Sequence, residues 1–263
     1  MAQSSLSRRD FGVLEKIKDP EANPLSTVLV DPNLPKDPNV EDALVYERVA
    51  QKERDIVVAI QQLEMELAGL RPSTSTEPIK DYRRCVDDIG QLISENPRYA
   101  SARNNRAQAL RRLYGDMMIL PRRSNPKALI QDADPDEISQ AALLVLSDLD
   151  EAISLLNPRS LFASISPVTG KTLSSAYTQR AAIYYTTSKS IRLDEAISLA
   201  GRKEEQWTKL DFENAASRDF ALGGRYGNEI AKGLAVSINP TAKLCGQIVR
   251  EAMKKEYGPA FAE

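Results

Sequence analysis

The residues best able to do chemistry in this 263-residue chain are carboxylates, because the sequence contains no histidine. Histidine is the commonest general base and metal ligand, so its absence excludes the Ser-His and Cys-His nucleophile systems. Two acidic clusters remain, Asp87-Asp88 and the group Asp148, Asp150 and Glu151. Paired carboxylates can divide the acid and base roles of a hydrolase between them. The same spacing is also typical of a solvated helix face, and that interpretation is favoured here.

Other catalytic and cofactor signatures are missing from the sequence. Neither the GxGxxG nor the GxxxxGK[ST] nucleotide fingerprint occurs. The two cysteines, Cys85 and Cys245, form no CxxC pair, so a zinc site is not expected. Each lies among helical apolar residues, which predicts buried free thiols. We therefore expect a protein that is not an enzyme and that has no metal or cofactor.

A cluster of basic residues raises the possibility of an anionic partner. It consists of six arginines between positions 103 and 123: Arg103, Arg106, Arg111, Arg112, Arg122 and Arg123. A patch of this kind can bind nucleic acid or an acidic protein. An acidic stretch at 132–137 follows at once, aromatic residues are few, and the net charge is −2. Nucleic-acid binding is thus the less favoured alternative, while an acidic protein partner stays open.

Composition indicates a folded protein without a membrane segment. Apolar residues make up 42% of the chain and charged residues 27%. No apolar run approaches the roughly 18 residues of a membrane helix. No apolar stretch follows Arg8 and Arg9, so the N-terminus does not resemble a signal peptide. We expect no membrane contact and a cytoplasmic location, with the nucleus as a second compartment.

The spacing of apolar residues predicts an all-α fold. Apolar positions recur at intervals of three and four residues, and no strand-like alternation of any length occurs. Asp136 is the expected cap of one helix, and Gly223-Gly224 is the expected stop of another. The expected helices span 41–70, 79–95, 98–114, 138–156, 171–187, 206–222, 228–238 and 241–257.

Proline-rich stretches divide the chain. Residues 1–40 contain five prolines and are expected to form an extended or disordered arm. Two apolar runs in this arm, Phe11–Ile17 and Val28–Val30, are candidates to pack along the helical body. The helical domain is expected at 41–256, followed by a tail at 257–263. It contains three predicted insertions, at 117–137, 157–170 and 188–205, of which the last contains a possible short helix.

Short segments recur in register along the helical domain. NNRAQAL (104–110) aligns with TQRAAIY (178–184), and SDLDEAISL (147–155) aligns with LDFENAASR (210–218). Together with NPRYASARNNRAQALRRLYGD (96–116) and INPTAKLCGQIVREAM (238–253), these segments resemble the tetratricopeptide repeat protein 36 family. The resemblance covers about half of the chain and identifies a larger, divergent member of fungal type. It implies three helix-turn-helix repeats in a short right-handed solenoid, closed by C-terminal capping helices.

The resemblance also implies a function. Members of this family are protein-interaction scaffolds associated with the Hsp70 chaperone and with the stability of an enzyme of tyrosine catabolism. The implied role is an adaptor that binds a peptide or helix of a protein partner, such as the chaperone or its client, in a concave groove. By register, nine residues are expected to face that groove: Ser101, Asn104, Asn105, Gln108, Arg112, Ser175, Thr178, Gln179 and Tyr185.

Many chaperone-binding repeats grip a terminal carboxylate through lysine, asparagine and arginine side chains. Asn105 matches the asparagine of that clamp, whereas Ser175 and Gln179 stand where its two cations are expected. Asn105 is alternatively a structural hydrogen-bonding residue between helices. A further alternative is a structural subunit of a larger complex whose groove is filled by its own N-terminal arm.

Overall fold

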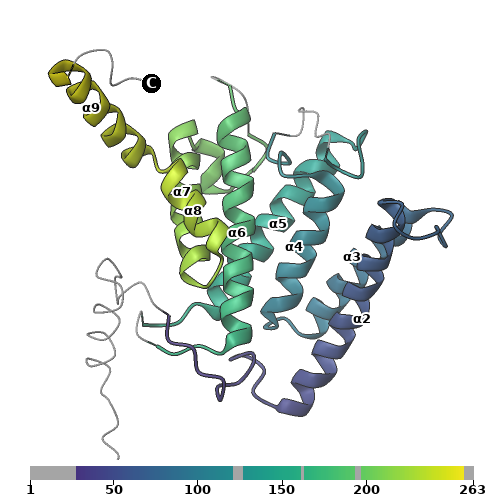
Figure 1. The fold of residues 1–263 in the computed structure, drawn as a ribbon. Coiled ribbons are helices and arrows are strands. Elements are labelled where there is room, and N and C mark those ends of the chain that lie inside the picture. The colour runs from purple at the N-terminus through teal and green to yellow at the C-terminus, as the bar shows by residue number, and fades with distance from the viewer. Residues whose placement is uncertain (1–27, 121–126, 161–162, 193–196, 258–263) are drawn as a thin grey trace, which may run out of the picture.

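The structure is a computed structural model that describes residues 28–120, 127–160, 163–192 and 197–257. The described chain is helical, and its only strand-like pairing is an isolated bridge between Val30 and Ile165. Figure 1 shows the helices following one another across the molecule in chain order. Their bounds are α2 Ala43–Leu67, α3 Pro78–Glu95, α4 Ala100–Tyr114, α5 Pro135–Leu156, α6 Pro167–Ser190, α7 Lys209–Arg225, α8 Glu229–Ile238 and α9 Pro240–Tyr257.

Local sequence explains where most of these helices begin. Side-chain oxygens of Asp42, Asp134, Ser166, Thr208 and Asn228 accept hydrogen bonds from the first free backbone N–H groups of α2, α5, α6, α7 and α8. Proline opens α3, α5 and α6, in the first turn, where its missing N–H removes no helical bond. The predicted cap Asp136 is wrong: Asp134 caps α5, and Asp136 lies in its first turn.

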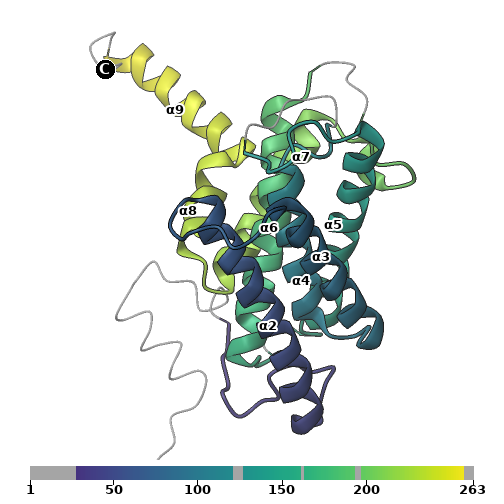
Figure 2. The same cartoon turned by 90° about the vertical axis from the view of Figure 1, so that its right-hand side faces the viewer.

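Consecutive helices pack against one another from α2 to α8, and α4 also contacts α6 directly. The main core lies between these helices and is rich in alanine, leucine and tyrosine. Six apolar residues at helical spacing on α3 are buried: Tyr82, Cys85, Val86, Ile89, Leu92 and Ile93. The last helix, α9, makes its main contacts with α7 and α8 and projects from the body, as two perpendicular views show (Figures 1 and 2).

The all-α prediction is confirmed for the described residues, and the first predicted helix is one continuous element. The Asn-Pro pairs Asn96-Pro97 and Asn157-Pro158 directly follow the last residues of α3 and α5. Cys85 is buried, but the prediction for Cys245 is wrong: it is exposed on the projecting α9. A buried position requires a neighbour that covers it, and in the described chain nothing covers that face of α9.

Gly223 and Gly224 lie inside α7 and do not end it, so this prediction is wrong. They are buried where α7 meets α6 and α8. A Cβ atom on Gly223 would lie 2.5 Å from Thr178 Oγ1, and one on Gly224 would lie 2.7 Å from the backbone of Lys232. Both glycines therefore permit the close approach of neighbouring helices.

The described part of the N-terminal arm, residues 28–40, lies across the start of α6. Asp31 donates its backbone N–H to the carbonyl of Ile165, and Ile165 donates to Leu29, each at 2.9 Å. Farther along, Ser166 Oγ donates to the carbonyl of Lys36 at 3.1 Å. The Val28–Val30 run thus contacts the helical body, whereas Phe11–Ile17 lies outside the described residues.

The predicted insertions are partly built into the fold. Met118 and Ile119 belong to the main core, Leu120 is also buried, and residues 167–170 form the first turn of α6. In the insertion 188–205, residues 197–200 are not helical, and a short 3-10 helix spans Lys203–Gln206. Residues 193–196, where the possible short helix was expected to begin, lie outside the described residues.

The packing at Gly224 predicts a contrast between two glycine-to-alanine substitutions. Gly224→Ala should destabilise the protein by about 1–3 kcal/mol, because the new methyl group overlaps the α8 backbone. Gly233→Ala, in the interior of α8, meets no atom within 4 Å and should stabilise the protein by up to about 1 kcal/mol. Thermal unfolding of the two variants measures the difference, and equal melting temperatures would contradict the close-approach role.

Candidate functional site

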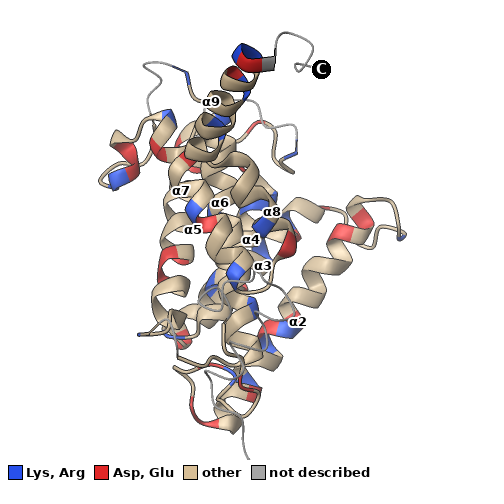
Figure 3. Cartoon of the chain, turned by 60° about the vertical axis from the view of Figure 1, so that its left-hand side comes forward, with Lys and Arg blue, Asp and Glu red and all other residues tan. Residues whose placement is uncertain are grey.

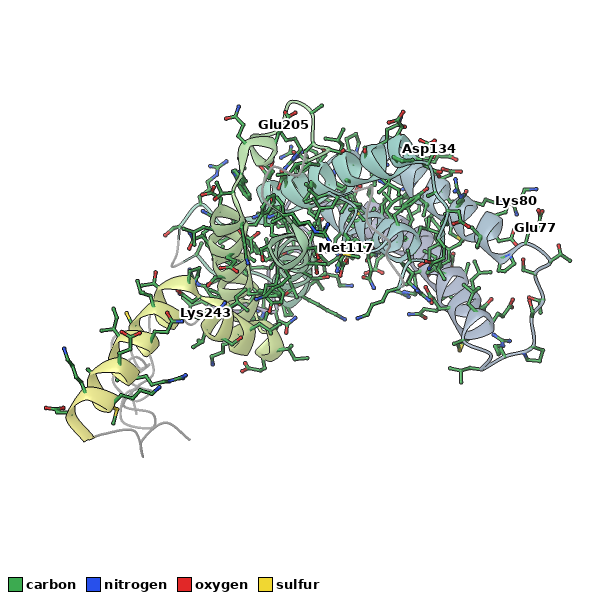
Figure 4. The ribbon with its side chains drawn as sticks, turned by 90° about the horizontal axis from the view of Figure 1, so that it is seen from above. Glu77, Lys80, Met117, Asp134, Glu205 and Lys243 are labelled. Carbon is green, nitrogen blue, oxygen red and sulfur yellow. The ribbon has the colours of Figure 1, made fainter. Side chains whose placement is uncertain are left out.

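A large groove runs over the same side of α2, α4 and α6. Its volume is about 1890 Å³, and its far end is closed by Val30 and by the turn between α7 and α8. Figure 4 shows the labelled lining residue Met117 in the middle of the molecule, between Glu77 and Lys80 on the α3 side and Lys243 on α9. The groove is therefore central and is built from helices that are distant in sequence.

The lining of the groove is apolar at its edges and neutral polar on its floor. The α2 wall presents Val57, Ile60 and Met65, and the opposite end presents Val30 and Ile230. Ile230 is 76% exposed and Val30 is 57% exposed, so both apolar side chains are open to a ligand. Between them, α4 and α6 supply amide and hydroxyl groups. This combination suits a protein segment that has both apolar and neutral polar side chains.

Six of the nine predicted groove residues line the groove in the structure: Asn105, Gln108, Arg112, Ser175, Thr178 and Gln179. Ser101, Asn104 and Tyr185 are not among its lining residues. Asn104 is buried under the floor, and the ring of Tyr185 packs edge-on against Phe220 of α7. For all nine residues, contact with a partner stays a prediction.

Asn105 holds α4 to α2. Its side-chain amide donates to Glu53 Oε1 at 2.8 Å, and the hydroxyl of Tyr99 donates to Glu53 Oε2 at 2.5 Å. Ser101 also bonds to this carboxyl group. Asn105 thus forms a structural hydrogen bond between two helices, as in the alternative interpretation, and it also lines the groove.

Glu53 was missed by the sequence analysis although it is the centre of this contact. It is only 7% exposed. Burial raises the pKa of its carboxyl group, and the bonds from Tyr99, Ser101 and Asn105 only partly oppose that effect. A signal was available, because Glu53 stands four residues after Val49 and three before Ile56, in the apolar register of its helix.

Gln179 is the counterpart of Asn105 in the aligned segments, and it plays a similar part between α6 and α4. Its amide donates to Asn104 Oδ1 at 2.8 Å, and its carbonyl oxygen accepts from Arg111 at 3.1 Å. Arg111 also pairs with Asp116 at 2.7 Å. A cation therefore does reach the groove beside Gln179, but an adjacent carboxylate neutralises it.

The described arginines of the basic cluster are engaged inside the protein. Arg103 and Arg106 both pair with Asp148, which is 1% exposed, and Arg106 does so through two bonds of 2.6 and 2.8 Å. Arg112 bonds to Glu64 of α2 at 2.9 Å and to the carbonyl of Lys127. Arg122 and Arg123 lie outside the described residues. In the view of Figure 3 both signs of charge are scattered along the helices.

Two of the candidate catalytic carboxylates, Asp148 and Asp150, form structural contacts. Asp148 lies between two arginines, and Asp150 bonds to Arg180 at 2.6 Å and to Arg202 at 2.5 Å. The other cluster, Asp87-Asp88, is solvent-exposed on α3. In the described part of the chain, no group of three metal-ligating side chains comes together, and no helix is long and apolar enough to cross a membrane.

The groove also has two exposed cations, Lys127 and Lys171, for which the described residues provide no ion pair. Lys127 follows the C-terminal end of α4, and Lys171 lies in the first turns of α6. They flank the groove and do not converge on Asn105. Within the described chain, the geometry for gripping a single terminal carboxylate near Asn105 is therefore missing.

The buried Glu53 predicts a pH-dependent difference between the wild type and Glu53→Gln. The pKa of Glu53 is raised in the folded protein above the ordinary value of 4.5, so the unfolded chain loses this proton first as the pH rises. The free energy of unfolding therefore falls between pH 4.5 and the raised pKa of the folded protein. The glutamine variant lacks this loss, so its stability relative to the wild type should increase over that range. Denaturant unfolding between pH 4 and 8 measures it, and a constant difference would contradict the buried-charge account.

Comparisons with known proteins extend the resemblance over nearly the whole chain. A protein of Aspergillus fumigatus named L-tyrosine degradation gene cluster protein hmgX is 32% identical over 263 aligned residues, covering 97% of this chain and 94% of the relative. Tetratricopeptide repeat protein 36 of Danio rerio is 28% identical, with 98% of each chain covered, and that of Bos taurus is 25% identical, with 93% and 92% covered. No family model and no solved structure matches. The chain is a divergent member of the tetratricopeptide repeat protein 36 family.

Proposed function

We propose that this protein is a non-catalytic scaffold whose groove binds a segment of another protein. The observation that carries the proposal is the groove of about 1890 Å³ across α2, α4 and α6. It is open, and its lining mixes apolar and neutral polar groups, as in surfaces that accept helices or extended peptides. Asp148 and Asp150, which could support catalysis, and Arg103 and Arg106, which could support nucleic-acid binding, are instead paired between helices.

The scaffold consists of three tetratricopeptide-type repeats, α2–α3, α4–α5 and α6–α7, followed by the capping helices α8 and α9. Repeated contacts support this division. Asn105 and Gln179 occupy the same position of the aligned segments, and each bonds to the preceding first helix. Arg106 and Arg180 occupy the next position, and each forms a two-bond pair with the following second helix.

The chemistry of the groove favours a ligand with apolar anchors rather than an acidic C-terminus. Val57, Ile60 and Met65 form one apolar contact area, and Val30 and Ile230 form a second. The floor between them can donate and accept hydrogen bonds without a net charge. An amphipathic helix or an extended segment with two apolar anchors matches this arrangement.

The biological partner that fits the relatives is an enzyme of L-tyrosine degradation, held in an Hsp70-linked complex. The name of the Aspergillus fumigatus relative connects it with an L-tyrosine degradation gene cluster. The family resemblance suggests the same pathway and the chaperone. In this proposal the protein acts as an adaptor that holds the enzyme, while catalysis belongs to the enzyme.

Two neighbouring valines of α2 give a matched test. Val57 lines the groove, whereas Val58 is 42% exposed and is not among its lining residues. Val57→Asp should reduce the recovery of the partner about tenfold, because it places an unpaired charge in an apolar contact. Val58→Asp should leave recovery unchanged. Affinity purification of the tagged full-length protein from its source cells, followed by quantitative mass spectrometry, measures both.

Melting temperatures of the two variants serve as the folding control. The enzyme and the chaperone should be recovered with the wild type and with Val58→Asp but not with Val57→Asp. Equal recovery of the same proteins by both folded variants would exclude the groove as the binding site.

A further inference from the structure

The groove has an apolar candidate ligand within the same chain. Residues 1–27 precede the described part of the arm, and their sequence includes the apolar run Phe11–Ile17, with Phe11, Val13, Leu14 and Ile17. We infer that this run binds in the groove of its own chain and competes there with the protein partner. The inference rests on the proposed function and adds the regulation of the same site.

The described chain begins beside the groove. Backbone bonds between residues 29–31 and Ile165 fix the arm beside the first turn of α6. Val30 itself lines the groove, together with Pro167, Gly170 and Lys171. The preceding residues are therefore tethered at the end of the groove, not at a distant surface.

The tether between the apolar run and Val28 is long enough to span the groove. Residues 18–27 separate Ile17 from Val28, and ten extended residues span up to about 33 Å. Three packed helices at interaxial distances of about 8–10 Å place α2 roughly 20 Å from α6. The Phe11–Ile17 run can therefore reach both the near apolar area at Val30 and Ile230 and the far wall at Val57 and Met65.

The apolar areas of the groove suit the run chemically, and the short tether raises the local concentration of the run. The two apolar areas are exposed and match a short apolar run better than they match the charged residues elsewhere in the arm. A short tether gives a local concentration on the order of millimolar, so even a weak contact would be substantially occupied. A partner with stronger anchors would displace the run, which makes it a competitor and not a permanent plug.

Photocrosslinking of the full-length protein tests this contact. The photoreactive residue p-benzoylphenylalanine replaces Phe11. This group reacts with nearby C–H bonds and favours methionine, and the groove is lined by two methionines, Met65 and Met117. Irradiation should yield crosslinks within one chain to one of these methionines or to adjacent lining residues, at a yield that does not depend on protein concentration.

Two backgrounds with the same change of charge serve as controls. Leu14→Asp should lower the crosslink yield about tenfold, because it removes a buried leucine from the contact. Ser5→Asp lies outside the apolar run and should leave the yield unchanged. Leu14→Asp should also raise partner recovery, since the competitor is weakened. The inference is overturned by crosslinks only between two chains, by crosslinks only outside the groove, or by equal yields in the two backgrounds.

The results that would overturn the inference differ from those that would overturn the proposed function. Crosslinks within the groove combined with unchanged partner recovery by Val57→Asp would support binding of the run in the groove but overturn the proposed function and, with it, the competition. Loss of partner recovery with no such crosslinks would overturn the inference and leave the proposed function in place.

Discussion

The fold depends on arginines that reach from one helix to buried carboxylates on the next. Arg106 on α4 pairs with Asp148 on α5, and Arg180 on α6 pairs with Asp219 on α7. Asp148 and Asp219 are 1% and 0% exposed, so an unpaired charge at either position would be strongly unfavourable. Each pair is formed through two parallel bonds, which fix the relative position and rotation of its two helices as well as their proximity.

This use of charge determines the character of the groove. Two-bond arginine–carboxylate pairs join the two helices of a pair, while the amides of Asn105 and Gln179 take part in the contacts between successive first helices. The surface shared by α2, α4 and α6 is consequently neutral over most of its floor and apolar at its ends. Lys127 and Lys171, for which the described residues provide no ion pair, also line it. A groove of this kind selects a ligand by apolar anchors and hydrogen bonds, in contrast to a clamp that selects by a terminal charge.

Much of the fold could be predicted from the sequence, because helix formation depends on short-range pattern. Apolar spacing located the helices and the buried face of α3, and Asn-Pro pairs located two of their ends. Features that depend on a neighbour could not be located in this way. Gly223 and Gly224 resemble a stop signal until α8 is seen packed on them. Cys245 has the spacing of a core residue, but within the described chain nothing covers it.

The candidate site was partly predictable, because helical register is also a short-range pattern. Six of the nine residues that helical register placed on a groove line the groove in the structure, whereas Asn104, one position from Asn105, is buried; contact of any of them with a partner stays a prediction. The arginine cluster resembled a binding patch because sequence alone does not reveal its partners Asp148, Asp116 and Glu64, of which only Asp116 is close in the chain. Glu53 stands in an apolar register, and only its contact with Tyr99 and Asn105 explains it.

The central claim is that the face formed by α2, α4 and α6 receives the partner. Hydrogen–deuterium exchange of the full-length protein, alone and with the partner recovered from its source cells, tests it most directly. The account predicts added protection in residues 55–65, 105–112 and 171–186, which belong to those three helices. Protection confined to α3, α5 and α7, or to the projecting α9, would contradict it.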